Sequence, residues 1–395
     1  MTVTNALFSG LLSVLLIRQS TADAQKYFSG VPRQSLDQLN LSFPAKVEPV
    51  NTLLSKSYAL LILSFALVSY PAASGADTTR GISPENHGFG RIEVLDDRLN
   101  DLIGPGAQLE VLAHGFKWSE GPLWLEEQQL VVFSDVPANT VYSWSEKEGK
   151  KIYLESSGYT GKEPRAGGLG SNGLALDPQG QLVLCQHGDR RIARMTSSVS
   201  HPASMFETLA SRYQGRLFNS PNDLVYDSTG SLYFTDPPYG LENGPDDPAR
   251  ELSYSGIYRL TPQGEVQLLY SGLARPNGIG LSPDERTLYV ANSDPEEATW
   301  TAFRINAEGS LEEPFVFHDA TSDVKANPGL PDGLKVDRAG NIFATGPGGV
   351  FIFSPQGDLL GRIYTGEPTA NLAFNSDESV IYITANDKLM RLRLH

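Results

Sequence analysis

The chain has almost no cysteine. Its 395 residues include one, Cys185, so no intrachain disulfide can form. Cys185 ends an apolar, strand-like run (LVLC), where a buried and inert thiol is the expected role. A disulfide scaffold and a metal site built on a cysteine cluster are therefore both excluded.

Basic residues are also scarce. Lysine and arginine total 31 against 46 aspartates and glutamates, which gives a formal net charge of −15. Nucleic acids and anionic membranes both require a basic surface on their partner, so this balance argues against either as a ligand. The other reading of the negative charge is that it serves solubility alone.

No apolar run is long enough to span a bilayer, which needs about 20 residues. The two longest stretches are Ala6–Ile17 and Tyr58–Tyr70. The second follows Lys56 and precedes the small residues at 72–76, which is the layout of a secretory signal. We therefore expect export to the periplasm or the cell exterior, with cleavage between Ala72 and Ala76.

The first stretch has a weaker version of the same layout and ends in Ala22-Asp23-Ala24. Residues 1–55 could thus precede the mature protein. We expect residues 1–80 to be a signal, targeting or disordered segment, and residues 81–395 to form one domain.

Motifs for nucleophilic or phosphate chemistry are missing. The chain contains no Gly-x-Ser-x-Gly elbow, no His-Glu-x-x-His helix and no Gly-rich loop that opens a helix. The segment Gly167–Gly170 precedes a strand-like run, so we interpret it as a loop. Long helical periodicity is absent too, whereas 38 glycines and 26 prolines are typical of many short strands joined by tight turns.

What the chain does contain is a sixfold repeat of strand-like runs. Each repeat opens with a polar residue before an apolar run, and a second apolar run starts ten or eleven residues later. The opening residues are Glu120, Asn172, Asn222, Asn277, Asp332 and Asn371. They are 52, 50, 55, 55 and 39 residues apart. Strand-type repeats at a period near 50 predict an all-β fold, a six-bladed β-propeller.

Turn-forming residues separate the two runs of most repeats, as in Asp177–Gly180 and Asp227–Gly230. Each repeat therefore starts with a β-hairpin, and later runs rich in β-branched and aromatic residues complete about four strands per blade. The last repeat is short by one strand. We expect the N-terminal side to supply it, from Arg91–Leu95 or from Gln108–Leu112.

The first strand of each propeller blade lines the central channel, so the six opening residues should form a ring at one mouth. Taken singly, each could instead cap a turn. Taken together, two carboxylates and four amides in one narrow channel require a neutralising cation. Oxygen ligands favour a hard divalent ion, Ca²⁺ first, with Mg²⁺ or Mn²⁺ as alternatives.

Residues about fourteen to sixteen positions after each opening should return to the same end of the blade if the second strand runs antiparallel to the first. They are Asp135, His187, Asp236, Asn292, Pro347 and Asn386. Asp135 and Asp236 could equally cap turns. His187 could hold a substrate hydroxyl or shuttle protons at the mouth, or lie in a surface loop without a role.

Several of these segments resemble the metal-site motifs of the SMP-30/gluconolactonase/LRE-like family. They are Ser119–Pro122, Asn219–Asp223, Arg275–Gly278 and Pro331–Gly333, and the resemblance covers about residues 90 to 395. It implies a six-bladed propeller with one divalent metal held by Glu120, Asn222, Asn277 and Asp332. Zn²⁺ is a further candidate for this ion, beside Ca²⁺, Mg²⁺ and Mn²⁺. The resemblance also makes Asp332 the candidate general base.

That family opens lactones, and the implied reaction is hydrolysis of a sugar lactone to its aldonic acid. A metal that polarises the lactone carbonyl needs a nearby carboxylate to accept the proton of the attacking water, and Asp332 or Glu120 is placed in the ring to do so. Asn172, His187 and Asn371 would contact the hydroxyls of the substrate. Two alternatives remain, a metal-dependent phosphotriesterase and a non-catalytic propeller that binds a partner. The oligomeric state cannot be inferred.

Overall fold

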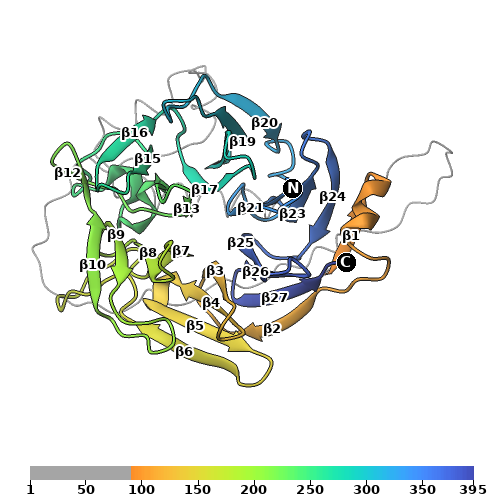
Figure 1. Cartoon of the computed structure of the whole chain (residues 1–395), viewed down its shortest axis with the longest axis horizontal. Helices are drawn as coiled ribbons and strands as arrows, with labels where there is room; N and C mark the ends of the chain where they lie inside the picture. The colour runs from red at the N-terminus through yellow and green to blue at the C-terminus, as the bar shows by residue number, and fades with distance from the viewer. Residues whose placement is uncertain (1–89) are drawn as a thin grey trace, which may run out of the picture. The chain divides into compact units, whose positions relative to one another are not determined.

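The computed structural model describes residues 90–395, which form a β-propeller of six sheets around a central axis (Figure 1). The predicted all-β, six-bladed architecture is therefore confirmed. Between residues 90 and 395 the helices are short 3₁₀ turns: η3 (Asp97–Asp101), η4 (Val136–Ala138), η5 (Pro238–Gly240) and η6 (Gly244–Asp246). In this part of the chain, no helix has the length and apolar character needed to cross a membrane.

The first four blades are each built from four strands that are consecutive in the chain. Blade one contains β3 (Ser119–Leu125), β4 (Leu130–Asp135), β5 (Thr140–Ser145) and β6 (Gly149–Glu155). Blade two contains β7 (Ser171–Leu176), β8 (Leu182–Gln186), β9 (Arg191–Met195) and β10 (Phe206–Ala210), followed by the small hairpin β11 (Arg212–Tyr213) and β12 (Arg216–Leu217). Blade three contains β13 (Leu224–Tyr226), β14 (Leu232–Asp236), β15 (Gly256–Leu260) and β16 (Val266–Tyr270). Blade four contains β17 (Pro276–Leu281), β18 (Thr287–Asp294), β19 (Glu297–Arg304) and β20 (Phe315–Asp319).

The last two blades each take a strand from the N-terminal side. Blade five consists of β21 (Leu334–Val336), β22 (Ile342–Gly346), β23 (Gly349–Phe353) and β24 (Leu359–Tyr364), with β1 (Arg91–Val94) as a fifth, outer strand. Blade six consists of β25 (Thr369–Phe374), β26 (Val380–Ala385) and β27 (Lys388–Arg393), and β2 (Glu110–His114) pairs antiparallel with β27. Of the two predicted closing segments, the one near Gln108–Leu112 completes the ring, and Arg91–Val94 extends blade five instead.

The six opening residues lie in the first residues of the innermost strand of a blade or, for Asn222 and Asp332, two residues before it. These strands are β3, β7, β13, β17, β21 and β25, which surround the centre of the ring in Figure 1. Their hairpin turns are closed as predicted: the Asp177 side chain, for example, accepts hydrogen bonds from the backbone of Gln179 and Gln181, both at 2.9 Å. The turns therefore lie at the end of the strands away from the openings.

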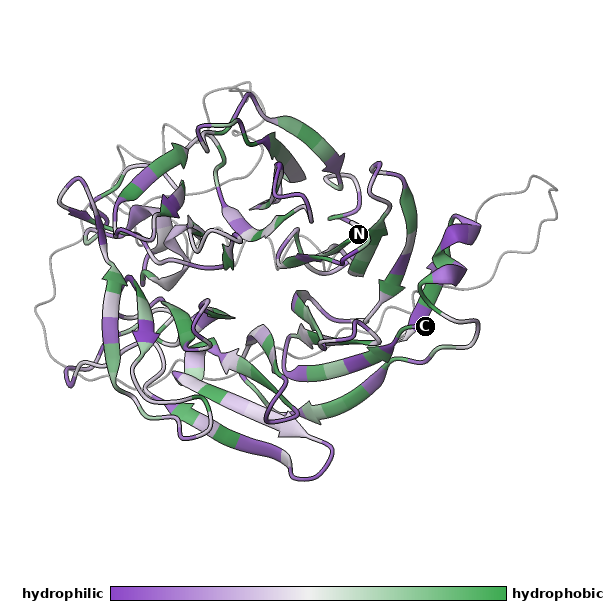
Figure 2. Ribbon diagram, viewed as in Figure 1, coloured by the Kyte–Doolittle hydropathy of each residue, from purple (hydrophilic) through white to green (hydrophobic). Residues whose placement is uncertain are grey.

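Hydrophobic side chains hold neighbouring blades together. Six clusters of buried residues are present in the described chain, one between each pair of adjacent blades. The cluster between blades six and one, for example, joins Phe133 of β4 to Tyr382 of β26 and Leu389 of β27. Figure 2 shows hydrophobic residues along the strands of the ring, interspersed with hydrophilic ones, and mostly hydrophilic residues in the loops. Burial of these faces fixes the ring and with it the position of the openings.

The predicted signal segment, its cleavage region and the domain boundary at residue 81 lie outside the described residues. They stay predictions, as does export. Cys185, on β8, is fully buried as expected.

Candidate active site

A cavity of about 530 Å³ lies where the innermost strands begin. Five of the six opening residues line it: Glu120, Asn172, Asn222, Asn277 and Asp332. Loops, short 3₁₀ turns and strand ends add the rest of the wall, namely Trp118, Val136, Pro137, Gly168, His187, Tyr239, Ser293, Gly329, Leu330, Pro368 and Thr369. The cavity is thus polar along the ring of openings and largely apolar in its surrounding wall.

Glycines after the openings let the blades approach closely. A Cβ atom at Gly121 would lie 2.1 Å from the backbone oxygen of Asn172 in the next blade, and one at Gly278 would lie 2.2 Å from that of Asp332. No side chain fits at either position. The recurring Glu-Gly, Asn-Gly and Asp-Gly pairs therefore have a packing reason: they narrow the ring until oxygens from different blades face one cavity.

Hydroxyl groups on the second strands fix the openings further. Ser134 donates to the backbone oxygen of Asn172 at 2.8 Å, and Thr235 donates to that of Asn277 at 2.7 Å. Ser293 makes the equivalent bond to Pro331, the residue before Asp332. Because each bond joins one blade to the next, the ring is rigidly held before any ligand binds.

The polar residues predicted to return to the mouth divide into two groups. His187 alone among them lines the cavity. The carboxylate of Asp135 accepts hydrogen bonds from the backbone of Lys117 and Trp118, and that of Asp236 accepts from Asn219 and Ser220.

Asn292 accepts in the same way from Arg275. The sequence left open that Asp135 and Asp236 cap turns, and these side chains do bind backbone N–H groups. They bind the backbone of the loop that enters each opening, however, and not that of the turn that follows.

Three oxygens at the ring have no hydrogen-bond partner within residues 90–395. They are Oδ1 of Asn172, Asn222 and Asp332, and each is buried. Glu120 is buried as well, and its Oε2 accepts a hydrogen bond from the backbone N–H of Gly121 at 3.0 Å. Buried acceptors that face one cavity without donors match the oxygen preference of a hard divalent cation. The described residues contain no cluster of three or more His, Cys, Asp or Glu side chains that could hold a metal, so amide oxygens would have to supply part of any such site.

The charges at the ring lead to the same expectation. Burial raises the pKa of both the Glu120 and the Asp332 carboxyl. The charge of Glu120 raises the pKa of Asp332 further, and the nearby Asp223 acts on both in the same direction. Two buried carboxyl groups of this kind cannot both ionise unless a cation neutralises them. The residues therefore fit a divalent ion.

His187 is the one titratable side chain of the wall besides Tyr239. Both of its ring nitrogens are buried and have no partner in the described part of the chain. Burial, with a smaller contribution from the charge of Arg165, lowers the pKa of His187 to about 3. The imidazole is therefore neutral at physiological pH and can offer one donor and one acceptor to a ligand.

This burial predicts a defined loss of stability in acid. The folded pKa of His187 lies below the unfolded value of about 6.5, so below that pH only the unfolded chain takes up the proton. The contribution to stability is complete above pH 6.5 and is lost progressively toward pH 3. Between pH 7 and pH 5 this should cost about 2 kcal/mol that a His187→Gln variant does not lose. Urea unfolding of both proteins at the two pH values measures it, and an equal loss in both would contradict the assignment.

Two wall residues carry polar groups that the repeat pattern does not reveal. Tyr239 lies in η5, just after the second strand of blade three, and burial raises the pKa of its hydroxyl. Ser293 follows Asn292 on β18 and accepts a hydrogen bond from Asn277 Nδ2 at 3.0 Å. Ser293 lies one residue after Asn292 and Tyr239 three residues after Asp236, so both are one to three residues away from the positions that the hairpin spacing singled out.

Asn371 is the one opening residue that does not line the cavity. Its Nδ2 donates to Asp223 Oδ2 at 3.3 Å, and its Oδ1 accepts from Lys335 Nζ at 3.2 Å. The side chain of the sixth opening residue thus contacts other side chains inside the channel and does not form part of the cavity wall.

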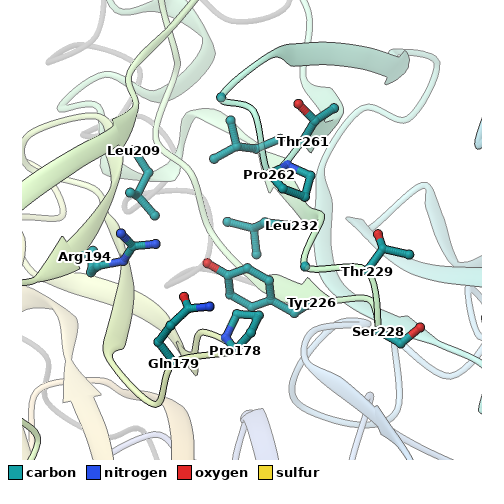
Figure 3. Close-up of a pocket in the computed structure, with 13 residues that line it drawn as sticks. Pro178, Gln179, Arg194, Leu209, Tyr226, Ser228, Thr229, Leu232, Thr261 and Pro262 are labelled. Atoms are coloured by element: carbon teal, nitrogen blue, oxygen red, sulfur yellow. The ribbon is translucent and has the colours of Figure 1, made fainter.

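A second cavity, of about 380 Å³, lies at the hairpin turns of blades two and three (Figure 3). Its wall includes Pro178, Tyr226 and Pro262, and Arg194 points into it. Arg194 Nε already pairs with Asp177 Oδ2 at 2.7 Å. The wall contains no carboxylate, so it offers neither a base nor a metal ligand, and the ring of openings is the stronger candidate for chemistry.

Comparisons with known proteins agree with this geometry. A family model described as SMP-30/Gluconolactonase/LRE-like region matches residues 118–387. The gluconolactonase of Zymomonas mobilis subsp. mobilis is 34% identical over 345 residues, which cover 85% of this chain and 95% of the relative. A solved gluconolactonase structure from Xanthomonas campestris is 33% identical with a TM-score of 0.66, over 77% of this chain and 94% of that one. A calcium-binding protein, regucalcin, from Agrobacterium tumefaciens shares the fold at 18% identity with a TM-score of 0.55, over 72% of this chain and 92% of that one.

Proposed function

The chain belongs to the SMP-30/gluconolactonase/LRE-like family, and on that premise we propose that it is a gluconolactonase-like hydrolase that opens a small sugar lactone. The observation that carries the proposal is the pair of carboxylates, Glu120 and Asp332, that share one cavity with unpartnered amide oxygens. Hydrolysis of an ester bond needs a base and a centre of positive charge, and this site can provide the base and bind a cation.

Four side chains would hold the cation: Glu120, Asn222, Asn277 and Asp332. Ca²⁺ is the first expectation because all four donors are oxygens, with Mg²⁺, Mn²⁺ or Zn²⁺ as alternatives. Such an ion supplies, when bound, polarisation of the carbonyl and stabilisation of the charge that develops on its oxygen.

Proton transfer falls to Asp332. A neutral water attacks the lactone carbonyl poorly, so a base must accept its proton as the bond forms. Asp332 lines the cavity, and its Oδ1 is buried without a hydrogen-bond partner in the described chain, so one oxygen of this carboxylate can contact the ion while the carboxylate accepts the proton. The proton can then pass to the ring oxygen as the ester C–O bond breaks.

Recognition of the substrate would use the polar atoms left in the wall. Asn172 Oδ1 can accept from a sugar hydroxyl, and the neutral imidazole of His187 can donate or accept. Tyr239 and Ser293 lie close enough to the ring to add further contacts. The side chain of Asn371, which the sequence predicts as a substrate contact, is instead hydrogen-bonded to Asp223 and Lys335.

A second candidate keeps the same site but changes the substrate. Trp118, Val136, Pro137, Leu330 and Pro368 make much of the wall apolar. An apolar wall accommodates a neutral phosphotriester, whose P=O group is polarised in the same way as a C=O group.

A substrate panel separates the possibilities. We expect the full-length protein to open aldono-lactones faster than simple aliphatic lactones or a phosphotriester, because only the sugar lactones satisfy Asn172 and His187. A pH-stat assay at equal substrate concentrations measures it. Preference for the phosphotriester would establish the second candidate, and turnover of none would leave a propeller that binds without catalysis.

A further inference from the structure

Three side chains close the central channel next to the cavity. Asp223 belongs to blade three, Lys335 to blade five and Asn371 to blade six. We call these residues the channel plug. Blades three and six are opposite one another in a ring of six, as β13 and β25 are in Figure 1, so the hydrogen bond of 3.3 Å from Asn371 to Asp223 spans the channel.

The ammonium group of Lys335 lies inside this plug. Its Nζ donates to Asn371 Oδ1 at 3.2 Å and to the backbone oxygen of Leu334 at 3.0 Å. It lies 3.6 Å from Asp223 Oδ2, and the Asp223 side chain is 3% exposed. A lysine is thus held beside a buried carboxylate, where its charge is weakly screened.

We propose that Lys335 is a built-in counter-cation. Its positive charge sets the net charge of the channel and thereby the affinity of the channel for a single divalent ion. The inference rests on the proposed cation site of Glu120, Asn222, Asn277 and Asp332. It assigns Lys335 and Asp223 a positioning role in that site, through charge and without contact to the substrate.

The net charge of the side chains around the site is consistent with this role of Lys335. With a divalent ion bound, the carboxylates of Glu120, Asp332 and Asp223 contribute three negative charges and Lys335 one positive charge, so these four side chains together carry a net charge of −2. That value matches one divalent cation. The plug also lies beside the cation site: Asp223 directly follows Asn222, and a Cβ atom at Gly333, the residue after Asp332, would lie 2.0 Å from Cγ of Asn371.

Asp223 occupies a place where other blades have glycine. The residue after the opening is glycine in blades one, two, four and five, whereas it is Asp223 in blade three. A carboxylate there is not required for the backbone to approach, since glycine serves that purpose elsewhere. Its pairing with Lys335 and Asn371 across the channel is therefore a specific feature of this blade.

The test is a charge cycle, in which metal affinity is measured after each of the two plug charges is removed singly and after both are removed together. Metal-stripped full-length protein is titrated with Mn²⁺ and with Ca²⁺ by calorimetry. Lys335→Met should tighten binding about tenfold or more, and Asp223→Asn should weaken it by a similar factor. The double variant restores the net charge of −2 and should return Kd to within about threefold of the parent.

Two further variants control for packing. Lys335→Arg keeps the charge and should bind like the parent. Arg194→Met removes another cation beside a buried carboxylate, with a side chain 27% exposed against 30% for Lys335, at the turns of blade two. It should leave Kd unchanged.

A structural role for Lys335 would give a different pattern. If Lys335→Met binds the ion like the parent, or if the double variant is weaker than both single variants, the counter-cation role is wrong. Should the parent bind no divalent ion, the proposed cation site fails and this inference with it. Lactone turnover by the parent is assayed separately, so failure of the proposed reaction is distinguishable from failure of the charge cycle.

Discussion

An Asp332→Asn protein is expected to bind a divalent ion at saturating concentration and to lose about 10²–10⁴-fold in kcat, the usual contribution of a general base. The substitution keeps an oxygen ligand and the shape of the side chain. It removes only the group that accepts the proton. The ion should bind more weakly because one negative charge is lost, so kcat must be measured with metal in excess over Kd.

A matched control is Asp227→Asn. Asp227 caps the hairpin turn of blade three, at the end of the strands away from the cavity. Its replacement should change kcat by less than about twofold, because it touches neither ligand nor substrate. If Asp332→Asn with bound metal turns over the lactone at the parental rate, the base is another residue, and Glu120 is the next to test.

A Gly278→Ala protein is expected to be less stable by about 2–3 kcal/mol and to bind the divalent ion at least about tenfold more weakly. The new Cβ would lie 2.2 Å from the backbone oxygen of Asp332, and no side-chain rotation can relieve contact with a backbone atom. Blades four and five must therefore separate, which moves Asp332 away from Asn277. Urea unfolding and metal titration measure the two effects.

Gly264→Ala provides the comparison for this prediction. Gly264 has φ +85° and nothing within 4 Å of an added Cβ, so alanine there meets backbone strain without a collision. It should cost about 1 kcal/mol and leave metal affinity unchanged. Equal metal affinities for the Gly278→Ala protein and the parent would show that the spacing of blades four and five does not position the ligands.

The repeat pattern predicted the architecture because each blade is a local unit. Hairpins such as β7–β8 are encoded within about fifteen residues, by a turn and two apolar runs. The opening residues followed from the same pattern, since the start of an innermost strand must face the axis. The sequence pattern did not determine which N-terminal segment completes blade six and closes the ring. β1 and β2 have similar strand-like sequences, and which one pairs with β27 depends on contacts more than 250 residues apart.

The site could be predicted only where it is built from that local pattern. Tyr239 reaches the cavity from a loop after β14, whose path no strand periodicity describes. The pairing of Asn371 with Asp223 joins residues 148 positions apart and depends on two blades being opposite in a ring of six. Asp135 and Asp236 were correctly placed at strand ends, but only the structure shows that they bind the backbone of the entering loop.

The ring of unpartnered oxygens and the two buried carboxylates support our proposal that lactone opening in this cavity depends on a divalent ion. The decisive experiment measures the rate at which chelator-treated protein opens D-glucono-lactone before and after a divalent ion is restored. We predict that chelation abolishes the enzymatic rate and that Ca²⁺, or another ion of the set, restores it in parallel with binding at Glu120, Asn222, Asn277 and Asp332. Full activity in protein shown to contain no metal would contradict the account.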